Sequence, residues 1–220
     1  NNIMNLRHIF ILPALLAAMA CSDDSPVTPD TPDTPEGPDI TNSVEKLVSI
    51  DAGQTFQTIA GFGASDCWSP AFVGKSWTSH RAGITELLFS SEIVGGKPKG
   101  IGLSQWRVNL GGGSAAQGEA CGIEDKSRRA ESYLTDDLTY DWTRCEGQRY
   151  FMDRAKELGC NNFVLFSNTP PVQYTYNGKG FSARGGLSNL KPEHYGDFAG
   201  YMADVAARYT AEGYHISHIS

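Results

Sequence analysis

The stretch that decides the fold is TRCEGQRYFMDRAKELGCNNFVLF, residues 143–166. Its first part repeats apolar side chains at helical spacing, at Tyr150, Phe151, Ala155 and Leu158. Thr143, followed three residues later by Glu146, is a capping-box signature, and Gly159 marks the helix end. The apolar run Phe163–Phe166 is typical of a strand buried on both faces in a parallel sheet. The segment therefore predicts a helix followed by a buried strand.

The same alternation continues on both sides of this stretch. Extended segments are expected at Lys46–Asp51, Thr55–Ala60, Gly102–Leu110 and His215–Ile219. Helices are expected at Ser79–Ser90 and from Pro192 to Gly213. Strands that alternate with helices indicate right-handed crossovers and a parallel sheet, so the predicted fold class is α/β. About four barrel strands fit this length, against eight in the roughly 250 residues of a closed barrel, which predicts the N-terminal half of a (β/α)8 TIM barrel.

Residues 1–20 have the pattern of an export signal. Arg7 and His8 form a short basic start, and the apolar run Ile9–Ala20 is too short to span a bilayer. The sequence before and including Cys21 resembles a bacterial lipobox, which predicts a lipid on Cys21 and a lipoprotein in the outer membrane or on the surface of a Gram-negative bacterium. The alternative is an ordinary signal cleaved after Ala20, which leaves Cys21 without lipid. Both interpretations predict export.

Residues 21–43 are predicted to form a disordered tether rich in proline and aspartate. From residue 22 to 43 the chain has five prolines, six acids and no base. Such a segment buries too little apolar surface to offset the conformational entropy lost on folding. Since Arg7 is the one charged residue before them, residues 44–220 carry a formal charge of −2 out of the total of −7. A nearly neutral folded part, residues 44–220, lacks the clustered bases of a nucleic-acid-binding protein and predicts a neutral ligand.

Four cysteines lie in the predicted folded part: Cys67, Cys121, Cys145 and Cys160. An exported chain permits up to two disulfides, and spacing alone does not fix the pairing. A bridge between Cys121 and Cys145 is favoured because both lie in one long loop, with Cys160 as a buried apolar residue. No CxxC pair exists, and His215 and His218 would face opposite sides of a strand, so no metal site is expected.

The run Gly111–Ala116, GGGSAA, matches the form of a dinucleotide-binding fingerprint. That function needs a helix that begins at once, and none is expected here, so the run is interpreted as a flexible rim of an active site. The sequence also lacks a GxSxG nucleophile elbow. No cofactor is expected.

Three predicted strand ends are rich in polar and aromatic residues: Gly61–Trp68, Trp106–Leu110 and Ser167–Pro171. In a barrel these ends form the active face. Aromatic rings there suit the C–H faces of sugars, while amides and carboxylates suit their hydroxyls. Core packing is expected of three aromatics, Phe62, Trp106 and Phe166. For Trp68 and Tyr174 a ligand role and core packing stay open, and Asp66 is either a helix N-cap or a group for a substrate hydroxyl.

Together these motifs resemble glycoside hydrolase family 30, retaining barrel enzymes among which the endo-β-1,6-galactanase branch is the most similar. The resemblance rests on Gln57–Asp66, Arg107–Ser114, Ser167–Pro171 and the run that ends His215–Ser220. This sequence departs from the family at Val172–Tyr174, where the family continues with Trp and Met. The resemblance also implies a β-sandwich side domain, to which Lys46–Ala60 would partly belong.

The resemblance implies an enzyme that cleaves β-linked polysaccharide. In the family the strand matching Ile216–Ser220 leads into Asn-Glu-Pro, whose Glu is the acid/base, and the nucleophilic Glu follows on strand seven. Neither position falls within these 220 residues, so no catalytic residue is assigned and the fragment alone is expected to be inactive. Five substrate-binding residues are implied: Asp66 and Trp68 in the sugar subsite, Arg107 and Asn109 bracing its floor, and Tyr174 at the entrance.

The alternative from another class is a non-catalytic glycan-binding lipoprotein on the cell surface, which the same export signal, tether and aromatic strand ends would serve. The membrane would be a partner of either protein through Cys21. The sequence leaves open the glycan and its linkage, endo or exo action, the disulfide pairing and the oligomeric state.

Overall fold

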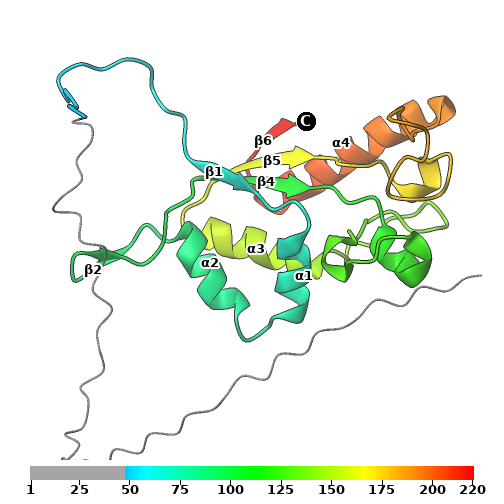
Figure 1. The fold of residues 1–220 in the computed structure, drawn as a ribbon, viewed down its shortest axis with the longest axis horizontal. Coiled ribbons are helices and arrows are strands. Elements are labelled where there is room, and N and C mark those ends of the chain that lie inside the picture. The colour runs from blue at the N-terminus through cyan, green and yellow to red at the C-terminus, as the bar shows by residue number, and fades with distance from the viewer. Residues whose placement is uncertain (1–47) are drawn as a thin grey trace, which may run out of the picture. The chain divides into compact units, whose positions relative to one another are not determined.

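The computed structural model describes residues 48–220 (Figure 1). The chain divides into two compact units, residues 1–56 and residues 57–220. The predicted signal, the lipidation site Cys21 and the tether lie outside the described residues. Of the first unit only residues 48–56 are described, and they form an exposed segment with a turn closed by Gln54 N–H and the Asp51 carbonyl. All helices and strands described below belong to the second unit.

Four parallel strands form the main sheet of the second unit. They are β1 (Gly63–Ser65), β4 (Gln105–Asn109), β5 (Asn162–Phe166) and β6 (Ile216–Ile219), in the order β1-β4-β5-β6. Trp106 pairs with Phe163, and the register of β5 with β6 shifts between Phe163 and Val164. The sequential order and parallel direction confirm the predicted α/β fold class.

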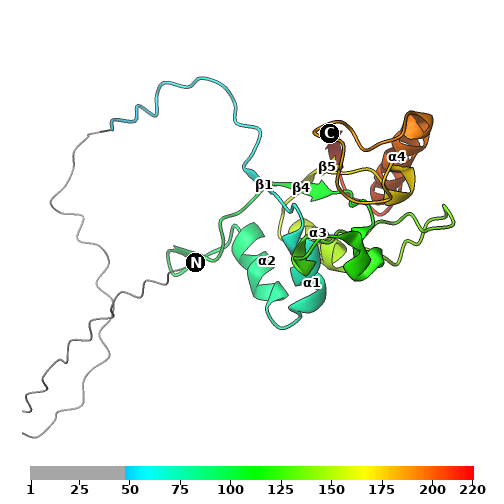
Figure 2. The ribbon, with the colours of Figure 1, turned by 45° about the vertical axis from the view of Figure 1, so that its right-hand side comes forward.

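Helices connect each strand to the next. The four α-helices are α1 (Ser69–Ser76), α2 (Arg81–Phe89), α3 (Glu146–Glu157) and α4 (Tyr195–Ala211). Helices α1, α2 and α3 lie on one face of the sheet (Figure 1 and Figure 2). A hairpin of β2 (Ile93–Val94) and β3 (Lys97–Pro98) follows α2, and 3-10 helices occupy Ser114–Cys121, Lys126–Arg128, Val172–Tyr174 and Pro192–His194. Within residues 48–220, no helix is both long and apolar enough to cross a lipid bilayer.

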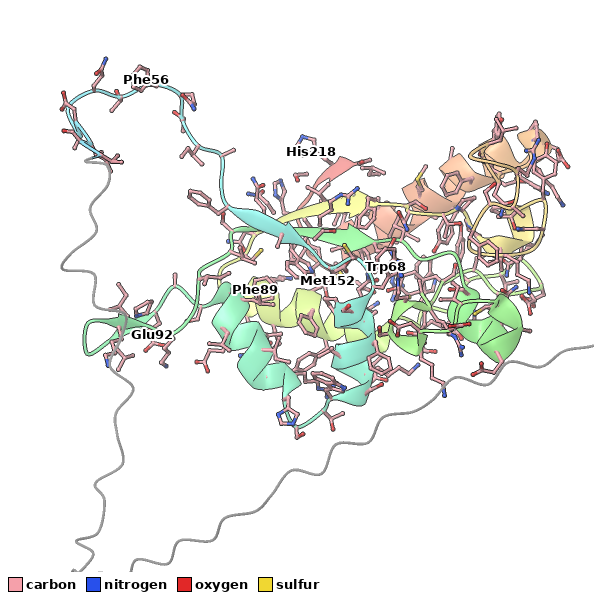
Figure 3. All side chains as sticks on the ribbon, viewed as in Figure 1. Phe56, Trp68, Phe89, Glu92, Met152 and His218 are labelled. Atoms are coloured by element: carbon pink, nitrogen blue, oxygen red, sulfur yellow. The ribbon has the colours of Figure 1, made fainter. Side chains whose placement is uncertain are left out.

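The core lies between the sheet and its helices. Alternate residues of β4 and β5 point toward the helices, and Trp106 packs edge-on against Phe89 with 5.0 Å between ring centroids. Figure 3 shows Phe89 and Met152 on this helical side of the sheet. Farther along, α4 contributes Tyr209, whose hydroxyl lies 2.8 Å from that of Tyr133. The buried pair of Tyr133 and Tyr209 therefore holds α4 to the loop before α3.

The packing of α1 against α3 depends on two glycines. A Cβ atom on Gly147 of α3 would overlap the carbonyl oxygen of Ala71 in α1 and come within 2.6 Å of the Lys75 nitrogen. A Cβ atom on Gly74 of α1 would likewise overlap the Gly147 carbonyl. The two helices are thus in backbone contact, which only residues without a side chain permit.

Several sequence predictions about local structure are wrong. Residues Thr55–Ala60 form no strand, because no described segment pairs with them, and the first strand is Gly63–Ser65. Phe62, expected in the core, is 69% exposed. The predicted capping box is not formed, since Thr143 donates to the Asp141 carboxylate and α3 begins at Glu146. A 3-10 helix also begins directly after Gly113, where a loop was expected.

The favoured disulfide between Cys121 and Cys145 is absent. Both are free thiols, as are Cys67 and Cys160. Cys121 Sγ accepts a hydrogen bond from the Ile123 N–H at 3.3 Å, whereas Cys145 precedes α3 and packs into the hydrophobic core. The two side chains therefore lie in different surroundings, and no disulfide joins them. Cys160 is buried, as predicted.

Candidate substrate-binding site

A cavity of about 360 Å³ opens where the parallel strands end. Three strands supply its floor: Trp68 follows β1, Asn109 ends β4, and Asn168 and Thr169 follow β5. Two loops supply its rim, one through Arg128 and the other through Phe181. The cavity therefore lies at the carboxyl ends of the strands, the face that carries the active site in α/β barrels.

The glycine run Gly111–Gly113 brings the loops of the cavity close together. A Cβ atom on Gly111 would overlap the Glu131 carbonyl, and one on Gly112 would come within 2.7 Å of the Pro170 carbonyl. Gly113 has φ of 95°, a left-handed conformation that favours glycine. Packing between the loops thus accounts for the glycines that resemble a dinucleotide motif.

Asn109 has a fixed main chain and an unengaged side chain. Its N–H donates to Asp66 Oδ1 at 2.9 Å, and its carbonyl accepts from Gln148 Nε2 at 2.8 Å. The residue is 4% exposed, and within residues 48–220 its Oδ1 has no hydrogen-bond partner. A buried oxygen without a partner costs free energy, and this oxygen is enclosed, so a molecule in the cavity does not reach it in the described structure. Asn109 thus lines the cavity from a main chain that Asp66 and Gln148 hold in place.

Asp66 lies behind the cavity wall and does not line it. It is 2% exposed, and its Oδ2 accepts from Gln148 Nε2 at 2.8 Å. It does not cap α1, whose N-cap position is Trp68. Burial raises the pKa of Asp66 to about 7, against the opposing effects of the bonds from Gln148 and Asn109 and of the Arg107 charge. Asp66 is therefore neither the N-cap of α1 nor a residue that lines this cavity. Its carboxylate holds Asn109 and Gln148 in place.

The raised pKa of Asp66 predicts that stability falls as the pH rises from about 4 to 7. In this range the folded protein keeps a proton that the unfolded chain, with a pKa near 3.8, has released. The free energy of unfolding falls by up to about 1.4 kcal/mol per pH unit, where Asp66 is protonated in the folded protein and ionised in the unfolded chain. We expect Asp66→Asn to remove this slope in urea unfolding measured at several pH values. An unchanged slope in Asp66→Asn would contradict the assignment, and Asp125→Asn, at an exposed carboxylate, is the matched control.

Of the other predicted residues, only Trp68 lines the cavity. Its half-buried ring lies under the Arg128 guanidinium, 4.8 Å from guanidinium carbon to ring centroid. Arg107 does not line this cavity, and its guanidinium stacks on Phe166 at 3.5 Å. Tyr174 is 7% exposed, stacks on His194 and belongs to the core, so its position does not support the predicted role at the entrance.

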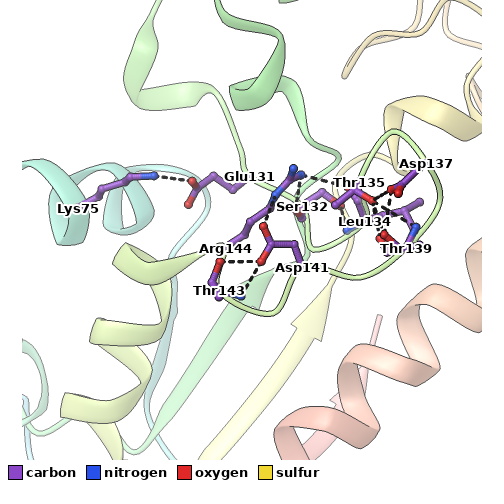
Figure 4. A network of polar contacts seen from close by, with 10 residues as sticks. All are labelled: Lys75, Glu131, Ser132, Leu134, Thr135, Asp137, Thr139, Asp141, Thr143 and Arg144. Carbon is purple, nitrogen blue, oxygen red and sulfur yellow. Dashed lines mark hydrogen bonds and ion pairs between the residues drawn. The ribbon is translucent and has the colours of Figure 1, made fainter.

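A polar network supports the loop between the cavity and α3 (Figure 4). Arg144 contacts the Asp141 carboxylate and the carbonyls of Ser132 and Leu134. At the end of the loop near the cavity, Glu131 accepts from Lys75 of α1 at 2.7 Å. These bonds fix the loop against α1 and α3, so the cavity wall that it forms is supported from behind.

Sequence reasoning missed three residues of this arrangement. Gln148 carried one usable signal, because it is a polar residue on the apolar face of a predicted helix. Arg128 and Phe181 come from loops without periodicity, and nothing in the sequence marked them. Among residues 48–220, no group of three or more His, Cys, Asp or Glu side chains is arranged to hold a metal ion.

A parallel sheet whose cavity lies at the strands' carboxyl ends defines an α/β protein, since barrels and open parallel sheets both bind ligands there. The chain belongs to O-glycosyl hydrolase family 30, whose family model matches residues 45–220. It is 27% identical over 174 residues to an endo-β-1,6-galactanase from Hypocrea rufa. The alignment covers 72% of this chain and 35% of that protein, so the chain spans about a third of its relative's length.

Solved structures show the same relationship. A conserved exported protein from Bacteroides fragilis is 36% identical and superposes with a TM-score of 0.71, over 77% of this chain and 35% of that chain. SrfJ from Salmonella typhimurium is 18% identical with a TM-score of 0.52, over 74% of this chain and 34% of that chain. The second likeness supports the fold alone. Both agree with the N-terminal half of a barrel.

Proposed function

We propose that the whole protein hydrolyses β-linked polysaccharide, with a β-1,6-galactan as the leading substrate. Family membership and the galactanase named among its relatives support this reaction class. The observation that carries the proposal to this chain is the cavity at the strand ends, which Asn109 and Trp68 line together. Rings and amides in this arrangement suit the C–H faces and hydroxyls of a sugar.

The proposed mechanism is retaining. Such an enzyme needs two carboxyl groups about 5 to 5.5 Å apart, one as nucleophile and one as acid/base, and forms a covalent glycosyl intermediate. No Asp or Glu of residues 48–220 lines the cavity, and Asp66 is enclosed behind it. We therefore assign the two carboxyl groups to other parts of the whole protein. The described residues bind and orient the sugar.

The proposal includes export and lipid attachment at Cys21, with the protein held at the outer membrane or cell surface. The signal-like residues 1–20 and the similarity to an exported Bacteroides protein support it. Labelled palmitate should enter the protein expressed in a Gram-negative host and should not enter Cys21→Ser. Absence of label from the unsubstituted protein would contradict lipidation.

Asn109→Ala should lower kcat/KM of the whole protein on β-1,6-galactan by about a hundredfold, since a hydrogen bond to the reacting sugar is lost. The measurement is reducing-sugar release from purified galactan. Asn161→Ala, at an exposed asparagine before β5, is the matched control and should leave the rate unchanged. Galactan binding without sugar release by the unsubstituted protein would instead support the non-catalytic glycan-binding function.

A further inference from the structure

Arg128 is the one charged side chain among the described residues that line the cavity. It ends the short 3-10 helix Lys126–Arg128 at the cavity rim. Within residues 48–220, its guanidinium takes part in no ion pair or hydrogen bond, and its contact is with the ring of Trp68. A cation is therefore present at the wall of a cavity whose other described walls are neutral.

Two acids near Arg128 in sequence bind other groups, and within residues 48–220 no ion pair joins Arg128 to a third, Glu124. Asp125 accepts hydrogen bonds from the N–H and hydroxyl of Ser127, at 2.8 and 2.7 Å. Glu119 forms a two-point ion pair with Arg129, at 3.2 and 3.1 Å. The neighbouring base thus has its counter-charge, while Arg128 keeps its donors for another partner.

The contact with Trp68 places the Arg128 guanidinium over the ring, 4.8 Å from its centroid. A guanidinium stacked on an aromatic ring keeps its N–H groups at its edge, where a planar two-point bond to an oxyanion can form. Carboxylate and sulfate oxygens both match this geometry. Asn109 also lines the cavity, and an amide suits an uncharged hydroxyl. Arg128 and Asn109 would thus bind different parts of one ligand, an anionic group and an uncharged hydroxyl.

We propose that the cavity selects an acidic glycan, in which a sugar that carries a carboxylate or a sulfate ester pairs with Arg128. This inference rests on the proposed glycan-cleaving function and specifies its substrate class. A role for Arg128 confined to covering Trp68 would give no discrimination between acidic and neutral sugars, so the two roles make different predictions.

The test compares four β-1,6-linked galacto-oligosaccharides by calorimetric titration of the whole protein. The probes are the neutral oligosaccharide, the same chain capped with glucuronate, its carboxyl-reduced form, and a sulfated form. We expect the glucuronate or sulfated probe to bind about tenfold or more tightly than the carboxyl-reduced probe, as charged hydrogen bonds allow. The tighter of these two acidic probes identifies the anion. Raising the salt concentration should reduce the preference.

Substitutions assign the preference to Arg128. Arg128→Gln should reduce the ratio of acidic to reduced-probe affinity to within about twofold of unity, and Arg128→Lys should retain part of it. Arg184→Gln is the matched control, because Arg184 also stacks on an aromatic ring, Tyr176 at 4.0 Å, but does not line the cavity. It should keep the full ratio.

Equal binding of the acidic and reduced probes, or a preference that survives in Arg128→Gln, would overturn the inference. If the neutral probe is bound and cleaved in either case, the proposed function stands while the inference fails. If no probe of the four is bound or cleaved, the proposed function fails together with it.

Discussion

Gly147→Ala should destabilise the protein by about 3 kcal/mol, because the added methyl group has no space between α1 and α3. The Cβ position overlaps the Ala71 carbonyl oxygen, a backbone atom that no rotamer change can move away. Relief requires α1 to shift as a whole, and Trp68 and Asp66 directly precede that helix. Urea unfolding followed by tryptophan fluorescence measures the loss.

The matched control for this substitution is Gly200→Ala. Gly200 also lies within a helix, but a Cβ atom there has no heavy atom within 4 Å. This change should stabilise the protein by about 0.5 to 1 kcal/mol through helix propensity alone. A similar effect of the two substitutions would show that α1 and α3 are not in backbone contact.

Asp66→Ala should cost about 3 kcal/mol, since it leaves the buried Asn109 N–H and one Gln148 N–H without an acceptor. Both donors are enclosed, so water does not replace the lost carboxylate. Unfolding at pH 7 measures the effect. Asp125→Ala removes a carboxylate that also accepts two hydrogen bonds but is exposed, and it should cost clearly less than Asp66→Ala. Equal losses in the two variants would contradict the bracing role of Asp66.

The sequence predicted the elements whose pattern extends over several turns or a full strand. Helix α3 and strand β5 lie where the periodicity of residues 143–166 placed them, because one buried face imposes that periodicity. Helix α1 was missed because its eight residues give barely two turns of pattern. The capping box failed because Asp141, two residues before Thr143, competes for its hydroxyl and N–H.

The candidate site was predictable only where a residue directly follows or ends a strand. Trp68 and Asn109 met that condition and line the cavity. Asp66 met it too, but its side chain turns toward α3, a direction that depends on Gln148, 82 positions away along the chain. Tyr174 lies in a 3-10 turn whose packing against His194 is a tertiary contact. Residues such as Arg128 reach the cavity through loop conformation, which sequence periodicity does not encode.

The backbone contact between α1 and α3 has a consequence for how specificity can change. Trp68 directly precedes α1, and the Asn109 carbonyl accepts from Gln148 of α3, so the helix crossing holds both floor positions. Of the two rim residues, Phe181 lies in a loop outside that crossing, whereas Arg128 ends a 3-10 helix and lies over the ring of Trp68. Substitutions at Phe181 should therefore change the rim and leave the floor's geometry intact, whereas substitutions at the helix crossing should displace the floor.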